Sequence, residues 1–360
     1  MADYNKNPFI NSDVLPVDIV FHPSWWYKNA GITFDEDFFY HPLKRVESEK
    51  KMESILYEKF GNFGLGNDRN SDLPIIGAVH NAAGYIISEM LGCKIIYQED
   101  AAPQVIAANR ESLEFNPENA FQSNAFKRLM NLCDKLKAKY GYITGDVNWG
   151  GVLNIALDVV GEKLFMSFFE QADETKQQIR NLAGLVEKFA VGIAHETGSS
   201  SISVNRNVRN IEQPVFLHSE CSHTMISTDM YEEFLMPIDV AWSKKYRPFG
   251  IHYCGKDPHR YAESFAKIET LDFLDVGWGG DVKKLREYLP DTFLNIRLDP
   301  VTINNYKCSE LKATISRLVL ESGNPFLTGI CCINMDDKVE DSKITAIFQT
   351  VEILKQEHLS

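Results

Sequence analysis

The sequence lacks the hallmarks of several large classes of protein. It contains no P-loop and no G-x-G-x-x-G motif, so its glycines offer no recognisable cradle for a nucleotide phosphate. No stretch approaches the ~18 uninterrupted apolar residues that a membrane-spanning helix needs. The opening segment, MADYNKNPFINSDVLP, has no basic region followed by an apolar run, as a secretory signal would. These absences predict a cytoplasmic protein without a membrane span.

Positive charge is scarce. The chain has 37 lysines and arginines against 50 aspartates and glutamates, which gives a net charge of −13 at pH 7. Nucleic acids and anionic membranes both bind to basic surfaces, so neither is expected as a partner. The hydrophobic fraction of 44% is normal for a globular protein with a full core. The composition therefore suits an ordinary soluble enzyme.

A disulfide framework is also absent. The seven cysteines are odd in number and unevenly spaced, which is typical of cytosolic thiols, some of which can be metal ligands. Cys93, Cys133 and Cys308 lie in or beside helical stretches and are expected to be packing thiols. Cys332 is expected to point into the core, and the pattern leaves Cys221 unassigned.

Short apolar runs alternate with longer stretches of helical periodicity, a pattern that indicates β–α units around a parallel sheet. The runs are IIGAVH (75–80), KIIYQ (94–98), YITGDV (142–147), VFLHSE (215–220), GIHYCG (250–255), FLDVGW (273–278), FLNIRL (293–298) and FLTGIC (326–331). Their number matches the (β/α)8 TIM barrel. We therefore predict an α/β fold, with a (β/α)8 barrel catalytic domain over residues 71–360. Residues 1–70 would form a helical and aromatic N-terminal extension that packs on the barrel.

Local signals place several helices around these runs. Residues 42–61 read as a helix in the N-terminal extension. In the stretch SELKATISRLVLESG, Ser309 is expected to cap a helix that ends at Gly323. The last helix is expected over residues 336–357, and the polar residues 199–214 are expected to form a loop or insertion.

Polar side chains gather where the predicted strands end, which is where barrels of this kind carry their function. These residues are His80 and Asn81, Asp146 and Asn148, His218 and Glu220, His252 and Cys254, and Cys331. We predict that the first two pairs contact a substrate and that His218 and Glu220 serve in catalysis. This concentration of potential ligands and acid–base groups is the first functional signal in the sequence.

The sharpest part of the pattern is His252-x-Cys254. Side chains two apart on a strand point to the same face, so an imidazole nitrogen and a thiolate would converge on one point. Nitrogen and sulfur suit zinc, and Cys331, at the end of the last strand, would be the third ligand. Three protein ligands leave one position open, as in catalytic zinc sites. Glu220 could occupy that position, act as an acid, or form a hydrogen bond that orients one of the ligating residues.

Four stretches carry a resemblance to a known family: FLHSECSHTMISTDMYEEFLMPID, GIHYCGKDPHRY, LDPVTI and NPFLTGICCIN. Over roughly residues 75–355 the chain resembles the uroporphyrinogen decarboxylase superfamily, and within it the zinc-dependent, corrinoid-linked methyltransferases. Those methyltransferases carry His-x-Cys followed at a similar distance by another cysteine, and here 76 residues separate Cys254 from Cys331. The resemblance implies a zinc enzyme of methyl-group chemistry, and homodimers are common in this superfamily.

Two departures separate the chain from the decarboxylases of that superfamily. It has no arginine-bearing motif of the Arg-Gln-Ala-Gly-Arg kind, through which those enzymes hold a polyanionic porphyrinogen. Where they have an aspartate at the end of the fourth strand, this chain has Ser219-Glu220-Cys221. Decarboxylation of a tetrapyrrole is therefore the least favoured of the functions that the resemblance implies.

The favoured function is transfer of a methyl group from a small donor, a methoxylated aromatic compound, to the Co(I) of a corrinoid protein. Zinc would act as a Lewis acid on the donor oxygen. Trp25, Trp26 and Tyr27 belong to an aromatic block that resembles the start of such O-demethylating methyltransferases, and they could stack on a planar donor. These rings could equally seal the core. The alternative function is methyl transfer from a corrinoid to a thiol, as in coenzyme M methyltransferases.

The corrinoid is expected on a separate protein. Cobalamin-binding domains carry a D-x-H-x-x-G-type motif, and the nearest match here, Asp257-Pro258-His259-Arg260-Tyr261-Ala262, lacks the glycine. A corrinoid protein would therefore have to dock over the mouth of the barrel.

Overall fold

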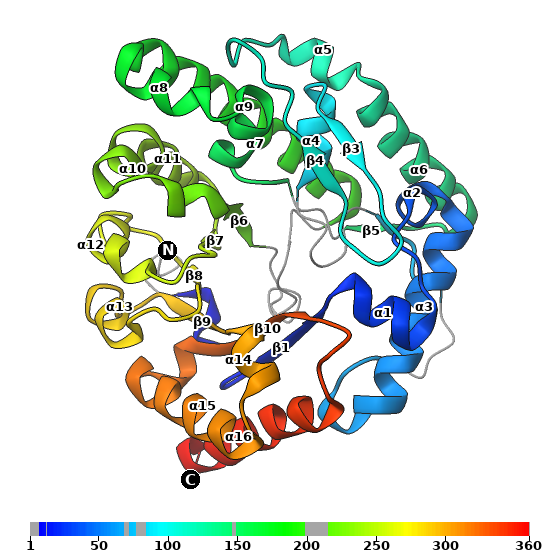
Figure 1. Ribbon diagram of the computed structural model, residues 1–360, viewed down its shortest axis with the longest axis vertical. Helices are drawn as coiled ribbons and strands as arrows, with labels where there is room; N and C mark the ends of the chain where they lie inside the picture. Colours follow the sequence, from blue (N-terminus) through cyan, green and yellow to red (C-terminus); the bar gives the residue numbers. More distant parts are fainter. Residues whose placement is uncertain are drawn as a thin grey trace, which may run out of the picture. The chain divides into compact units, whose positions relative to one another are not determined.

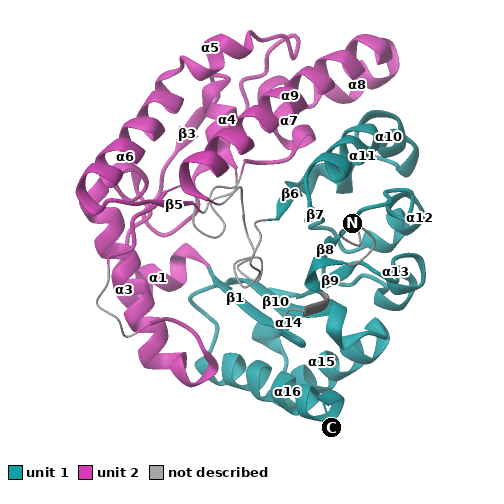
Figure 2. Cartoon of the chain, turned by 180° about the vertical axis from the view of Figure 1, so that it is seen from behind, with its two compact units in different colours: residues 1–21, 205–360 teal, residues 22–204 magenta. Residues whose placement is uncertain are grey.

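The structure is a computed structural model that describes residues 7–11, 13–67, 72–76, 84–145, 149–198 and 215–359 (Figure 1). The chain divides into two units (Figure 2). Unit 1 combines Met1–Phe21 with Asn205–Ser360, and unit 2 spans His22–Val204. Among the described helices, none has both the length and the apolar character that crossing a membrane requires.

Unit 1 is built on one curved sheet in which every neighbouring pair of strands is parallel. Its order is β1-β10-β9-β8-β7-β6. The strands are β1 (Val17–Phe21), β6 (Phe216–Ser219), β7 (Phe249–His252), β8 (Phe273–Val276), β9 (Phe293–Leu298) and β10 (Thr328–Met335). Strands β6 to β9 are buried along their whole length, as parallel strands covered on both faces are.

Helices follow the strands of unit 1. They are α10 (Thr228–Phe234), α11 (Met236–Lys245), α12 (Ala262–Phe265), α13 (Val282–Tyr288), α14 (Pro300–Asn305), α15 (Cys308–Ser322) and α16 (Asp341–Leu359). Short 3-10 turns accompany them: η1 (Pro8–Asn11), η4 (Cys221–Met225), η5 (Pro258–Tyr261) and η6 (Pro325–Leu327). The alternation of strand and helix after β6 is the α/β pattern that the sequence predicts.

The predicted stop of α15 is confirmed, but its predicted start is wrong. Gly323 ends the helix with φ +66°, a conformation that suits glycine. The helix begins one residue before the expected cap Ser309, and Lys307 is the N-cap, with its N–H donating to the Glu310 carboxylate at 2.7 Å. The last helix also begins later than predicted, at Asp341, because Asp336 accepts the Lys338 N–H in a separate turn.

The amino ends of β8 and β9 are covered by the N-terminal segment of unit 1. The Phe9 ring lies 4.8 Å from Phe293 and 5.4 Å from Phe273, which are the first residues of β9 and β8. The Asn7 amide donates to the Asp272 carbonyl oxygen at 2.8 Å. This end of the sheet is therefore filled by packing, and polar chemistry is left to the carboxyl ends of the strands.

Unit 2 is mainly helical. Its helices are α1 (Pro23–Ala30), α2 (Glu36–Tyr40), α3 (Pro42–Phe60), α4 (Tyr85–Met90), α5 (Pro117–Phe121), α6 (Asn124–Tyr140), α7 (Val152–Val160), α8 (Lys163–Glu170) and α9 (Ala172–Thr197), with η2 (Gly61–Phe63). The helix predicted over residues 42–61 is confirmed as α3. Two short strands, β2 (Ile75–Ile76) and β5 (Thr144–Gly145), pair in parallel within this unit.

One predicted strand belongs to a different kind of sheet. The KIIYQ run contains β3 (Lys94–Ile96), which pairs antiparallel with β4 (Gln104–Ile106) as a hairpin, so the prediction of a parallel strand here is wrong. The physical reason lies in exposure: Lys94 and Ile96 are both exposed, whereas a barrel strand would be buried.

A strand absent from the prediction lies in the segment assigned to the N-terminal extension. Strand β1 pairs in parallel with β10, with Asp18 opposite Cys331. Six parallel strands in unit 1 and the β2–β5 pair in unit 2 establish a mixed α/β fold with a curved parallel sheet. Closure into an eight-stranded barrel and the domain boundary at residue 70 stay predictions.

Candidate metal-binding site

The carboxyl ends of β6 and β7 lie side by side. The strands pair in parallel, with Ser219 opposite His252 as the last residue of each. Cys221 follows β6 at the start of η4, and Cys254 follows β7. Neighbouring parallel strands deliver the residues that follow them to the same edge of the sheet, and this places two cysteines beside one histidine.

Three potential ligands meet at this edge. The Cys254 sulfur lies 2.8 Å from His252 Nε2 and 2.7 Å from the Cys221 sulfur. One ligand atom from each residue falls within 4.8 Å of the other two. We call this group the Cys221–His252–Cys254 cluster. Two sulfurs and one imidazole nitrogen are a donor set that fits zinc, and three protein ligands leave room for a substrate atom.

The two cysteines of the cluster differ in their protonation state. A hydrogen bond from Cys221 and the nearby positive charge of His252 hold the pKa of Cys254 well below its usual range, so this sulfur is a thiolate. The same hydrogen bond, together with burial, raises the pKa of Cys221 well above its usual value, so it is the thiol that donates. Burial alone would lower the pKa of His252, but the Cys254 thiolate and Asp275 raise it to about 9.

A relay of buried polar groups fixes the orientation of His252. His252 Nδ1 lies 2.7 Å from Asp275 Oδ2, and the Asn295 amide donates to Asp275 Oδ1 at 2.7 Å. The three residues are successive register partners on β7, β8 and β9. Because Nδ1 faces the carboxylate, Nε2 is left to face the sulfurs, which is the usual support for a metal-binding histidine.

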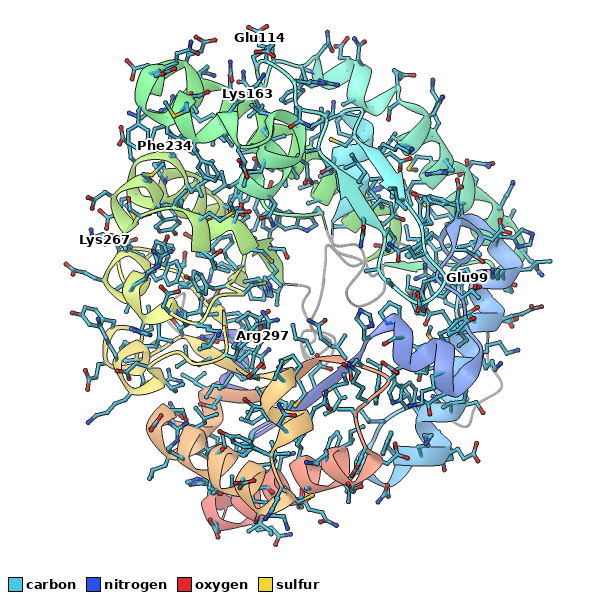
Figure 3. All side chains as sticks on the ribbon, viewed as in Figure 1. Glu99, Glu114, Lys163, Phe234, Lys267 and Arg297 are labelled. Carbon is cyan, nitrogen blue, oxygen red and sulfur yellow. The ribbon has the colours of Figure 1, made fainter. Side chains whose placement is uncertain are left out.

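Arg297, which Figure 3 labels, lies on β9, two residues beyond Asn295. Its side chain contacts the cluster. Its Nη1 is 3.4 Å from His252 Nε2 and 3.7 Å from the Cys254 sulfur. The guanidinium carbon lies 5.3 Å from the centre of the Trp278 ring, a cation–π distance. A positive charge thus stands beside the proposed ligand atoms.

The predicted catalytic pair His218 and Glu220 lies beside the cluster in sequence and is buried. His218 Nε2 is 3.6 Å from Glu220 Oε2, and its Nδ1 is 2.6 Å from Asp239 Oδ1. Burial alone would lower the pKa of His218, but the negative charge of Asp239 raises it. The Tyr231 hydroxyl donates to the other Asp239 oxygen at 2.7 Å. The structure therefore supplies His218 with a carboxylate partner that the sequence does not predict.

The structure groups a different cysteine with His252 and Cys254 from the one that the sequence predicts as the third ligand. Cys221 belongs to the cluster and Cys331 lies outside it, while the role of Cys331 as a ligand stays a prediction. The reason is strand order, because β8 and β9 separate β10 from β7 in the sheet. Cys331 is instead opposite Arg297 in register and is buried in a small apolar group with Val20 and Ile333, against Trp278.

The other predicted site residues fall into two groups. His80, Asn81, Asp146 and Asn148 lie outside the residues that the structure describes. Trp25 and Trp26 are each 1% exposed on α1, with their rings packed edge to face at 4.8 Å, while Tyr27 is 43% exposed. The two tryptophans therefore behave as core residues, and substrate contact by this block stays a prediction.

A close approach between two glycines shapes the loop that carries Cys254. A Cβ atom on Gly277 would lie 1.8 Å from the Gly255 carbonyl oxygen, so only glycine fits there. We expect Gly277→Ala to lower the free energy of unfolding by about 1–3 kcal/mol, because the two loops must separate. Urea denaturation measures the change.

Gly184→Ala is the matched control for this substitution. A Cβ atom at this position on α9 meets nothing within 4 Å, so the same chemical change should leave stability unchanged or raise it. Equal unfolding midpoints for the wild type and Gly277→Ala would contradict the clash.

Comparison with known proteins gives a likeness of fold. No protein-family model and no curated sequence matches the chain. A solved methyltransferase from Methanosarcina mazei superposes with a TM-score of 0.66 at 14% identity, covering 99% of this chain and 98% of that one. A B12-independent methionine synthase from Shewanella sp. W3-18-1, in complex with selenomethionine, superposes with a TM-score of 0.54 at 11% identity. The match covers 96% of this chain and 99% of that one. The chain therefore shares its fold, over nearly its whole length, with a methyltransferase and a methionine synthase.

Proposed function

We propose that this chain is a zinc-dependent methyltransferase that moves a methyl group from a methoxylated aromatic donor to the Co(I) of a separate corrinoid protein. The observation that carries the proposal is the Cys221–His252–Cys254 cluster at the carboxyl ends of β6 and β7. The fold shared with a methyltransferase agrees with it.

The cluster supplies the ligands for the metal. Cys254 is already a thiolate, Cys221 would lose its proton on binding, and His252 would offer Nε2 while Asp275 holds Nδ1. Zinc bound there would supply Lewis acidity to the ether oxygen of the donor. A phenolate leaving group needs more than ~5 kcal/mol of stabilisation to leave at a useful rate, and a metal site can provide it.

Methyl transfer would break the bond between the ether oxygen and the methyl carbon, and the partner's Co(I) would supply the electron pair that takes up the methyl group. The phenolate then needs a proton. His218 is the group that we assign to hold that proton, because Asp239 at 2.6 Å favours its charged form. Glu220, 3.6 Å from the other nitrogen of His218, would favour the same state.

The proposed partners follow from the same chemistry. The chain has no D-x-H-x-x-G motif of its own, so the corrinoid would be presented by another protein that docks at the site. A homodimer is proposed from the family resemblance, and light scattering of the purified protein tests it.

The experiment compares two methyl-transfer reactions with zinc-loaded protein. In one, free cob(I)alamin is the acceptor and 4-methoxybenzoate is the donor, and loss of Co(I) absorbance is followed together with release of 4-hydroxybenzoate. In the other, methylcobalamin is the donor and 2-mercaptoethanesulfonate is the acceptor. We expect transfer in the first reaction only, and its loss on removal of zinc with a chelator.

The outcomes separate the alternatives. Activity only in the second reaction would replace the proposal by a methyl-corrinoid:thiol methyltransferase. Absence of zinc-dependent transfer in both reactions would contradict methyl transfer altogether. The Cys308→Ser variant serves as a control, because Cys308 lies at the start of α15 and contacts the Ser342 carbonyl oxygen, not the cluster.

A further inference from the structure

Two of the seven cysteines lie in contact with each other and are partly open to solvent. The sulfurs of Cys221 and Cys254 are 2.7 Å apart, and neither residue is fully buried. Of the other five cysteines, only Cys308 is also partly exposed, and its sulfur contacts a backbone carbonyl oxygen. An oxidant that enters the site therefore meets a pair of sulfurs and not a single one.

The backbone segments that carry the two sulfurs are tied together. The Tyr261 hydroxyl shares its proton between the carbonyl oxygens of His223 and Ile226, at 2.7 and 2.8 Å. Arg260 Nη2 donates to the same His223 oxygen at 2.7 Å. Tyr261 and Arg260 belong to η5, which follows β7, whereas His223 belongs to η4, which follows β6. These bonds hold the two loops in contact, so only small side-chain movements are needed to join the sulfurs.

The surroundings of the pair decide which sulfur reacts first. His252 Nε2 lies 2.8 Å and Arg297 Nη1 lies 3.7 Å from the Cys254 sulfur. Positively charged neighbours stabilise a thiolate, and the thiolate is the form of cysteine that peroxides oxidise. Cys254 is therefore the sulfur that an oxidant attacks first, and Cys221 is placed to react with the product.

We infer that Cys221 and Cys254 form a reversible disulfide when the metal-free protein meets a peroxide, and that this bond switches off metal binding. The Cys254 thiolate attacks the O–O bond of hydrogen peroxide, becomes a sulfenic acid and releases hydroxide, which takes up a proton. The Cys221 sulfur then attacks the sulfenic sulfur, and water leaves.

The balance of the two steps is simple. Two thiols and one hydrogen peroxide give one disulfide and two water molecules, so the cysteines lose two electrons and the peroxide gains them. The sulfurs of a disulfide carry no thiolate charge for a metal ion. The Cys221–His252–Cys254 cluster would therefore hold zinc again only after a thiol reductant has opened the bond.

Titration of metal-free wild-type protein with hydrogen peroxide tests the inference. Zinc is removed with a chelator in the presence of a reductant, and the reductant is then removed. We expect one equivalent of peroxide to consume two of the seven thiols and to lower the intact mass by two hydrogen atoms. Peptide mapping should find residues 221 and 254 in one cross-linked pair. Zinc binding should be lost together with the thiols and should return after treatment with dithiothreitol.

Cys221→Ser shows whether Cys221 protects its neighbour. With no second thiol, Cys254 should gain two or three oxygen atoms in excess peroxide, as sulfinic or sulfonic acid, which dithiothreitol does not reverse. Cys308→Ser is the matched control, because Cys308 is partly exposed and its sulfur contacts the Ser342 carbonyl oxygen. This variant should form the disulfide as the wild type does.

Three results would overturn the inference. They are oxygen addition to wild-type Cys254 without a cross-link, a cross-link from Cys254 to Cys331, and loss of two thiols with zinc binding unchanged. The inference goes beyond the proposed function, because it needs the pair of sulfurs and no methyl donor. Failure of methyl transfer with a preserved disulfide would refute the proposed function alone. Zinc-dependent methyl transfer by a protein that forms no disulfide would refute the inference alone.

Discussion

Replacing Cys254 by serine is expected to remove stoichiometric zinc from the protein. Wild-type protein isolated with a reductant should hold about one zinc per chain, as a single three-ligand site does. The substitution removes the thiolate that both His252 Nε2 and Cys221 contact, so zinc affinity should fall at least about 100-fold. Elemental analysis after dialysis and competition with a chromogenic chelator measure the loss, and zinc-dependent methyl transfer should disappear with it.

Two further substitutions distinguish the ligand set of the structure from that of the sequence. Cys221→Ser should weaken zinc binding as Cys254→Ser does, because its sulfur lies 2.7 Å from that of Cys254. Cys331→Ser should leave zinc affinity within about threefold of the wild type, because its sulfur lies outside the cluster. Loss of zinc from Cys331→Ser, together with normal zinc binding by Cys221→Ser, would make Cys331 the third ligand. The control Cys308→Ser should retain zinc in either case.

Zinc affinity is expected to rise steeply with pH. In the metal-free protein the pKa of His252 is about 9, raised against the effect of burial by the Cys254 thiolate and Asp275, so the imidazole is protonated at pH 7. Cys221 is a thiol, because its pKa is raised. Zinc must displace both protons, so about two should be released at pH 7, and affinity should rise about 100-fold per pH unit. Calorimetry in buffers with different ionisation enthalpies counts the protons.

Protonation of His252 also decides how the free energy of unfolding of the metal-free protein changes with pH. The folded-state pKa of His252 lies above its ordinary value of 6.5, so in metal-free protein its contribution is complete below about pH 6.5. That contribution is lost as pH rises through about 9. The increase in melting temperature that zinc produces should therefore grow between pH 6.5 and 9. A zinc-induced increase in melting temperature that stays constant between pH 6.5 and 9 would contradict the assigned protonation states. Uptake of protons on zinc binding would contradict them too.

Asp275→Asn provides the control for this pH dependence. The Asp275 carboxylate contacts His252 Nδ1 at 2.7 Å and helps to raise its pKa. With an amide in its place, zinc affinity should fall about 10- to 100-fold, as is typical when the support behind a histidine ligand is removed. The pH dependence of binding should also become shallower, because less proton is displaced from the imidazole.

The strands of unit 1 were the most predictable part of the fold. Strands β6 to β9 are buried on both faces and therefore appear in the sequence as apolar runs, each bounded by polar or turn residues. The hairpin strand β3 lies in another short apolar run, KIIYQ, which does not reveal that the two ends of the strand are exposed. Strand β1 precedes the others by some two hundred residues, and only its pairing with β10 makes it part of the sheet.

The site was predictable only where a local rule applied. His252 and Cys254 are two residues apart at a strand end, and the alternation of side chains along a strand brings them together. Cys221 begins the 3-10 turn η4, where that alternation no longer applies. Asp275, Asn295 and Arg297 needed the register of β7, β8 and β9, which no single run of sequence contains.

The pairing of β1 with β10 joins residues from near the two ends of the chain in one hydrogen-bonded ladder. A shortened chain that starts after Phe21 would leave β10 without its neighbour on that side. The uncovered strand would present an apolar, β-branched and sulfur-containing row to solvent, and such edges recruit other chains. Fusions and tags placed ahead of Asn7, where the packed N-terminal segment begins, should thus be tolerated, whereas trimming past Phe21 should yield insoluble aggregates.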